Sequence, residues 1–177
     1  MSMKETEATR PSAMASVCGI FCSACSFYIA THEDPARLDK LASSFGVSRE
    51  AVRCDGCRGG HRIDYCANCH MFQCATERGY QFCAECPECP CAELETFMAE
   101  RPHRADIRRD LVRIAEIGPE AWLVEATERH SCPDCGTLNS SYDLACRTCG
   151  RDPSSPFVQE HRALIITRLR QDGARRR

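Results

Sequence analysis

Apolar and polar residues alternate along this chain with the period of short amphipathic helices. The helix expected from Pro35 has a defined start and end, because Asp34 is suited to cap it and Gly46 to end it. Its apolar stripe consists of Leu38, Leu41, Ala42 and Phe45. The same period predicts further helices over residues 67–78, 91–101, 104–117, 118–130 and 156–171. We therefore expect a mainly α fold.

The later helices each carry apolar residues. We expect Leu94, Phe97 and Met98 to pack inward, and Ile107, Leu111 and Ile114 to share one face of their helix. The apolar residues of the last helix are Phe157, Leu164, Ile165 and Leu169. Trp122 lies at helical spacing with Ala126, so we expect it in the core rather than on a base-stacking surface. We expect the chain to divide into six parts. They are a disordered lead-in (1–14), a cysteine-rich domain (15–103), a helical connector (104–130), a zinc ribbon (131–152), a last helix (153–171) and a disordered basic tail (172–177).

Cysteine content indicates what stabilises this fold. The chain has 16 cysteines among 177 residues, and they inflate the apolar fraction of 43%, so ordinary hydrophobic residues are few for a self-sufficient core. Many form C-x-x-C pairs, in which one tight turn directs two thiolates to the same ion. A structural zinc site contributes about 10 to 16 kcal/mol, so we expect metal to replace part of the core and the metal-free protein to be largely unfolded.

The sixteen cysteines divide into four sets of four. A zinc ribbon is predicted from two C-x-x-C-G knuckles, and its ligands are Cys132, Cys135, Cys146 and Cys149. A second set is Cys54, Cys57, Cys66 and Cys69. The preferred division of the rest assigns Cys74, Cys83, Cys86 and Cys91 to a third ion, and Cys18, Cys22, Cys25 and Cys89 to a fourth. Cys89 and Cys91 can exchange roles, and the alternative fourth ligands are His32, His61 and His70.

Long cysteine motifs connect the chain to a known family. The motifs are CGIFCSACSFYIAT, CDGC and YCANCHMFQCATERGYQFCAECPECPC, and they span roughly residues 16–98. In them the chain resembles an uncharacterised prokaryotic cysteine-rich family, a domain of unknown function. Some members also look like this chain in the helix and ribbon that follow. The resemblance implies a metal-binding fold and no activity, and the position of Cys89 is usually not cysteine in that family.

Other chemistries share these spacings. The three cysteines at 18, 22 and 25 have the radical-SAM spacing, but the strand and helix alternation of the required barrel is missing. Cys66 to His70 spells the haem-attachment motif C-x-x-C-H, yet the polar N-terminal stretch shows no export signal. Four-thiolate ligation also suits iron, so a [4Fe-4S] cluster at Cys18, Cys22, Cys25 and a fourth cysteine is the main alternative to zinc.

Charge and location narrow the function classes. The polar N-terminus predicts a cytoplasmic protein with reduced thiols rather than disulfides, and no apolar run is long enough to span a membrane. The net charge of −2 would fall to about −10 with four four-cysteine zinc sites. The arginine stripes of residues 104–113 and 162–177 are interrupted by acidic residues, which favours a solvated face over a nucleic-acid surface.

These features predict a zinc-binding structural or adaptor protein with about four zinc sites and a protein partner. An enzyme is not favoured, because the sequence offers no nucleophile and base pair, no carboxylate dyad in a recognisable setting and no phosphate loop. The alternatives are an iron–sulfur protein for electron transfer or redox sensing, and a protein for metal storage or delivery.

Overall fold

The computed structural model describes residues 14–175, and these residues are mainly helical. The α-helices are α1 Ser26–His32, α2 Pro35–Phe45, α3 Asp64–Ala67, α4 His70–Arg78, α5 Ala92–Ala99, α6 Ile107–Ile117, α7 Pro119–His130 and α8 Pro156–Arg175. Short 3-10 helices, including η2 Cys22–Ala24, η4 Cys83–Glu85 and η5 Pro102–Arg104, connect them. Within residues 14–175 no strand forms beyond isolated bridges. The expectation of a mainly α fold is confirmed.

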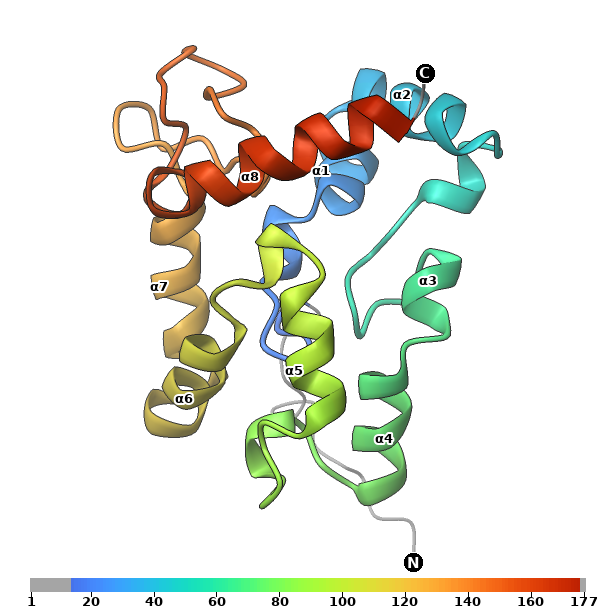
Figure 1. The fold of residues 1–177 in the computed structure, drawn as a ribbon, viewed down its shortest axis with the longest axis vertical. Helices are drawn as coiled ribbons and strands as arrows, with labels where there is room; N and C mark the ends of the chain where they lie inside the picture. The colour runs from blue at the N-terminus through green and yellow to red at the C-terminus, as the bar shows by residue number, and fades with distance from the viewer. Residues whose placement is uncertain (1–13, 176–177) are drawn as a thin grey trace, which may run out of the picture.

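The helices surround a small interior. In Figure 1, α6 and α7 lie side by side on one flank, α4 lies on the other, and α5 runs between them. Helix α8 crosses one end of the molecule and contacts α7 and η5. The loop between α4 and α5 lies at the opposite end. The expected lead-in lies outside the described residues except for Met14, as do residues 176–177 of the expected tail.

The termini of α2 follow from its sequence. The Asp34 side chain accepts a hydrogen bond from a first-turn amide at 2.9 Å, and Pro35 occupies the first turn, where its missing N–H is not needed. Gly46 ends the helix with a φ of 65°, a left-handed conformation that favours glycine. Leu38 and Ala42 are buried, as the stripe predicts. The cap and the stop at Gly46 are therefore confirmed, whereas the stripe is confirmed only in part, because Phe45 at its end is 58% exposed.

The core is divided into small clusters that alternate with cysteines. One cluster consists of Val17, Cys18, Met71, Ala75, Leu94, Phe97, Ile107 and Leu111. A second is centred on Trp122, whose ring meets Phe21 edge-on with centroids 6.2 Å apart. Trp122 is fully buried, so its predicted place in the core is confirmed. Because each cluster is small, the cysteines between them are well placed to determine how the helices associate.

Two predictions about the helices were wrong in part. Residues 67–78 do not form one helix, because α3 ends at Ala67 and α4 begins at His70. Helix α8 continues to Arg175, past residue 171 where it was expected to end. Among its apolar residues, Ile165 is fully buried beside Phe157 and Val158, whereas Leu164 and Leu169 are 57% and 40% exposed. The packing surface, rather than apolar content alone, selects which face of a helix is buried.

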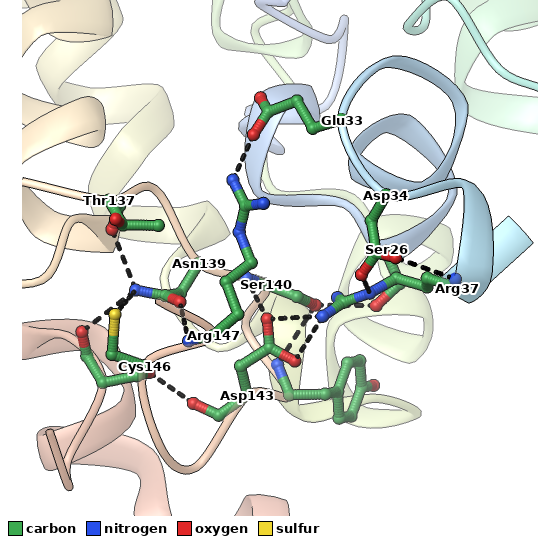
Figure 2. A network of polar contacts seen from close by, with 12 residues as sticks. Ser26, Glu33, Asp34, Arg37, Thr137, Asn139, Ser140, Asp143, Cys146 and Arg147 are labelled. Carbon is green, nitrogen blue, oxygen red and sulfur yellow. Dashed lines mark hydrogen bonds and ion pairs between the residues drawn. The ribbon is translucent and has the colours of Figure 1, made fainter. Parts of the chain in front are cut away.

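Residues 131–152, here called the C-terminal cysteine unit, dock on α1 and α2 through polar contacts (Figure 2). The Asp143 carboxylate accepts two hydrogen bonds from the Arg37 guanidinium, at 3.0 and 3.1 Å, and the Ser26 and Ser140 hydroxyls lie 2.7 Å apart. The Arg147 guanidinium donates to the Glu33 carboxylate. This unit is therefore tied to the cysteine-rich part of the chain by hydrogen bonds and ion pairs.

One more property of the helices bears on location. Among residues 14–175, no helix combines the length and the apolar character needed to cross a bilayer.

Candidate metal centres

The four cysteines of the C-terminal cysteine unit converge on one point. Their sulfur atoms all lie within 4.8 Å of one another; this quartet is Cys132, Cys135, Cys146 and Cys149. The Cys132–Cys149 and Cys135–Cys146 sulfur distances are 3.6 and 3.7 Å. A tetrahedral zinc ion with Zn–S bonds of about 2.3 Å holds its ligands about 3.8 Å apart. These distances match ligation of one ion and are much longer than a disulfide bond of about 2.05 Å.

Neighbouring donors favour negative charge on two sulfurs of the quartet. At Cys149 a backbone hydrogen bond of Arg151 lowers the pKa, but the neighbouring cysteines of the quartet outweigh it and raise that pKa to about 12. Burial would raise the pKa of Cys146, but backbone N–H groups of Cys149 and Thr148 outweigh it and lower that pKa to about 6. The Asn139 side-chain amide also donates to Cys146 Sγ at 3.6 Å (Figure 2). The hydroxyl and amide of Thr137 lower the pKa of Cys135. Such N–H donors stabilise thiolates, the form of cysteine that binds metal.

Seven cysteines gather between α1 and α3, and we call them the seven-cysteine group: Cys18, Cys22, Cys25, Cys54, Cys57, Cys66 and Cys69. Burial, with smaller contributions from the nearby Cys57 and Cys69 thiols, raises the pKa of Cys18 to about 11. Burial likewise raises the pKa of Cys66 to about 12, with Cys25 and Cys54 as its strongest thiol neighbours. A cation is therefore needed to hold these sulfurs as thiolates.

The backbone points donors at these sulfurs. Four of them accept amide N–H groups: Ile20 donates to Cys18, Cys57 to Cys22, Tyr28 to Cys25 and Val17 to Cys57. The Cys57 amide is 3.4 Å from Cys22 Sγ. Gly19 has a φ of 86°, a conformation that favours glycine, where the chain turns between Cys18 and Cys22. The Cys54 amide donates to the Thr31 hydroxyl at 2.9 Å, which ties the second knuckle to α1.

The remaining five cysteines line a cavity of about 40 Å³ between α4 and α5. We call it the five-cysteine pocket: Cys74, Cys83, Cys86, Cys89 and Cys91. All five are half-buried. Burial raises the pKa of Cys83 to about 12, with further contributions from Cys18, Cys89, Cys91 and Cys74. Cys18 thus lies near the junction between the pocket and the seven-cysteine group.

The structure groups the cysteines differently from the preferred division by fours. Cys89 lies with Cys86 and Cys91 in the pocket, whereas the thiol neighbours of Cys22 and Cys25 are Cys57 and Cys54. The C-terminal quartet is the one predicted set whose four sulfurs meet within 4.8 Å among the residues described. None of the three alternative histidines joins a group of ligand atoms at that distance in the same range.

One further group of potential ligand atoms occurs between residues 14 and 175, and sequence spacing did not suggest it. Asp106, Glu160 and His161 lie within 4.8 Å of one another. Arg129 donates to both carboxylates, and His161 Nε2 is 2.8 Å from Asp106 Oδ1. Burial opposes ionisation of Asp106, but these partners hold its pKa below the usual range. Because a guanidinium already satisfies the carboxylates, we interpret this group as an ion-pair network between α6, α7 and α8.

Two arginines beside the seven-cysteine group were also missed. Arg58 donates to the Ala15 carbonyl at 2.9 Å, and the Arg62 guanidinium stacks on Phe72 at 4.3 Å from the ring centroid. Both lower the pKa of Cys57, although burial raises that pKa overall. They supply positive charge against a cluster of thiolates.

Comparison with known proteins adds one finding. Residues 14–96 match a family model. Its description is Protein of unknown function (DUF3795). The matched segment contains the seven-cysteine group and the five-cysteine pocket, and the C-terminal quartet lies outside it. No curated protein and no solved structure matched the chain. The similarity supports an uncharacterised cysteine-rich family, which agrees with the resemblance noted from the motifs.

Proposed function

We propose that this protein is a zinc-binding structural module that presents a helical surface to a protein partner. The observation that carries the proposal is the C-terminal quartet, whose sulfur distances of 3.6 and 3.7 Å fit one tetrahedral ion. In a [4Fe-4S] cluster each thiolate binds a different iron, so the sulfur atoms lie farther apart than around one ion. The sulfur distances therefore support one ion rather than a [4Fe-4S] cluster, and we assign this site to zinc.

The seven-cysteine group takes two further ions in this proposal. Two separate tetrahedral ions need eight ligand positions, and seven thiolates fill them when one thiolate bridges both ions. Cys22 is the bridging residue that the contacts favour, because its thiol neighbours include Cys57, Cys25 and Cys18. Arg58 offsets part of the resulting negative charge. With one ion in the quartet and one in the five-cysteine pocket, the total is four, as the sequence predicts.

Metal content is the first test. Protein purified without oxygen should be colourless and contain about four zinc ions per chain. Cys135→Ser should remove one of them, raise amide hydrogen exchange in residues 131–152 and leave residues 16–98 protected. Global loss of protection in that variant would contradict a ribbon that folds around its own ion.

A second candidate function is an iron–sulfur protein for electron transfer or redox sensing. One observation favours it: among the described residues, no three sulfurs of the twelve N-terminal cysteines come within 4.8 Å of one another, a spacing wider than a single ion requires. The cluster would use Cys18, Cys22 and Cys25, with Cys57 as the neighbouring fourth thiolate. A brown protein with about four irons and correspondingly less zinc would establish it and refute the purely structural role.

A further inference from the structure

One short segment of the C-terminal cysteine unit serves both the quartet and the docking contacts. This segment, residues 138–147, is here called the docking loop. It contains Cys146, the first ligand of the second knuckle. It also contains Ser140, Asp143 and Arg147, whose side chains reach α1, α2 and the turn between them (Figure 2). A change in how the loop docks can therefore act on the metal site.

Asn139 connects the loop to the quartet. Its side chain is fully buried, and its amide nitrogen lies 3.6 Å from Cys146 Sγ, 2.9 Å from the Thr137 carbonyl oxygen and 3.3 Å from the Ser154 carbonyl oxygen. Its side-chain oxygen accepts the Arg147 amide at 3.0 Å. Hydrogen bonds to ionised acceptors are about twice as strong as those between neutral groups, so this amide favours a metal-bound thiolate at Cys146.

The residue after Asn139 carries one docking contact and supports another. The Ser140 hydroxyl lies 2.7 Å from the Ser26 hydroxyl of α1, and the Ser140 amide donates to Asp143 at 2.9 Å. The same Asp143 carboxylate accepts the two hydrogen bonds of Arg37 on α2. The backbone that positions Asn139 is thus held from its C-terminal side by α1 and α2.

Arg147 holds Asn139 from the other end of the loop. Its amide donates to Asn139, while its guanidinium donates to the Leu138 carbonyl at 2.9 Å and to the Glu33 carboxylate that follows α1. One arginine therefore contacts the residue before Asn139, Asn139 itself and the docking surface. Undocking removes contacts on both sides of Asn139 at once, so its hydrogen bond to Cys146 is expected to weaken.

We propose that docking of the loop on α1 and α2 regulates how firmly the C-terminal quartet holds its ion, with Asn139 as the positioning residue that couples the two. This rests on the proposed zinc-binding function and adds regulation to that site. Coupling between two equilibria is reciprocal, so loss of the ion weakens docking by the same factor. Cys135 and Cys149 are exposed, which makes this ion accessible to chelators in the docked protein.

Peptide-resolved alkylation of the zinc-loaded full chain measures the coupling. In excess EDTA with iodoacetamide, the rate at which the quartet cysteines are modified reports loss of their ion. Asp143→Asn should raise this rate about fivefold or more, the low end of typical coupling between sites, although the contacts of Asp143 are to Arg37 and Ser140 and not to sulfur. Asp152→Asn is the matched control: it breaks an exposed pair with Arg162 and should leave the rate unchanged.

A double-mutant cycle tests the role of Asn139. Loss of an outer-shell partner typically lowers metal affinity 10- to 100-fold, so Asn139→Ala should speed the loss of the ion strongly. Adding Asp143→Asn to Asn139→Ala should produce no further increase, because the coupling residue is already gone. Effects that multiply in the double variant would refute the role of Asn139. A wild-type rate in Asp143→Asn would refute the coupling, and this arm decides even if Asn139→Ala does not fold.

Cadmium-113 NMR of the cadmium-loaded chain provides a readout that undocking alone would not change. The quartet resonance is the one missing from Cys149→Ser. Asn139→Ala should shift it, because a ligand sulfur loses a donor, and Asp143→Asn should shift it less, in the same direction. An unmoved resonance in Asp143→Asn would overturn the coupling and leave zinc binding intact. A quartet that binds neither zinc nor cadmium would instead refute the underlying function.

Discussion

Replacing Asp143 by asparagine tests how strongly the C-terminal cysteine unit is docked on α2. The Asp143 carboxylate accepts two hydrogen bonds from Arg37, at 3.0 and 3.1 Å, and one from the Ser140 amide at 2.9 Å (Figure 2). Asparagine keeps the size of the side chain and one acceptor oxygen. It removes the charge and turns an N–H₂ group toward the guanidinium.

The structure predicts a cost larger than that of an ordinary surface ion pair. The two side chains are only 17% and 18% exposed, and one guanidinium nitrogen, Nη2, contacts both carboxylate oxygens. Hydrogen bonds to charged groups contribute about 1.5 to 3 kcal/mol when a partner is lost from a partly buried site, so we expect the free energy of unfolding to fall by about 2 kcal/mol. Arg37 keeps its contact with Asp34 at 3.2 Å, so the loss should not exceed this range.

Urea unfolding of the zinc-loaded protein, followed by Trp122 fluorescence, measures the effect. Trp122 is the sole tryptophan and lies in α7, which leads directly into the C-terminal cysteine unit. Asp39→Asn is the matched control, because the Asp39–Arg49 pair has a similar distance of 3.1 Å but side chains that are 59% and 56% exposed. The control should cost about 0.5 kcal/mol or less. Equal losses in the two variants would refute the docking role of Asp143.

Two further predictions concern Gly19 and His103. Gly19→Ala should lower the free energy of unfolding in urea by about 1 to 2 kcal/mol, because the φ of Gly19 is 86°. Gly60→Ala is the control: Gly60 has open space around it, so the change should be within about 0.5 kcal/mol. Equal losses in the two variants would contradict this reasoning. Burial lowers the pKa of His103 to about 3, whereas the pKa of histidine in an unfolded chain is about 6.5. Between these two values the unfolded state binds a proton that the folded state does not bind. The free energy of unfolding therefore falls as the pH drops from 6.5 toward 3. His103→Gln should reduce the stability loss measured between pH 6.5 and 5.5, and the same change at the exposed His70 should not. An unchanged slope of stability against pH in His103→Gln would refute the assignment of this loss to His103.

Local signals account for the parts of the fold that were predicted correctly. The cap at Asp34 and the stop at Gly46 act within one turn of their own positions, so they can be read without tertiary information. The stripe of α6 is similarly clear, since Ile107, Leu111 and Ile114 recur at helical spacing and are all buried. The C-terminal quartet could be found because its two knuckles are close in sequence and bring their four sulfurs within 4.8 Å of one another.

The features that were missed depend on contacts between distant segments. Asp106 meets His161 and Glu160 only because α8 packs against α7 and η5, and no spacing rule connects positions so far apart. The exposed Leu164 on α8 has the same explanation. A helix with apolar residues around much of its circumference does not specify which face the rest of the chain will cover.

The cysteines combine both situations. A C-x-x-C pair is local in sequence, but which pairs share an ion depends on tertiary contacts. The Cys54 amide donates to Thr31 and brings that knuckle to Cys25. Cys89 lies with Cys91 on the far side of the cysteine-rich region. Division by fours and the proposed grouping of seven, five and four both predict four ions. Metal content therefore does not distinguish them, whereas thiol reactivity does, because only the proposed grouping leaves a cysteine of the five-cysteine pocket without a metal bond.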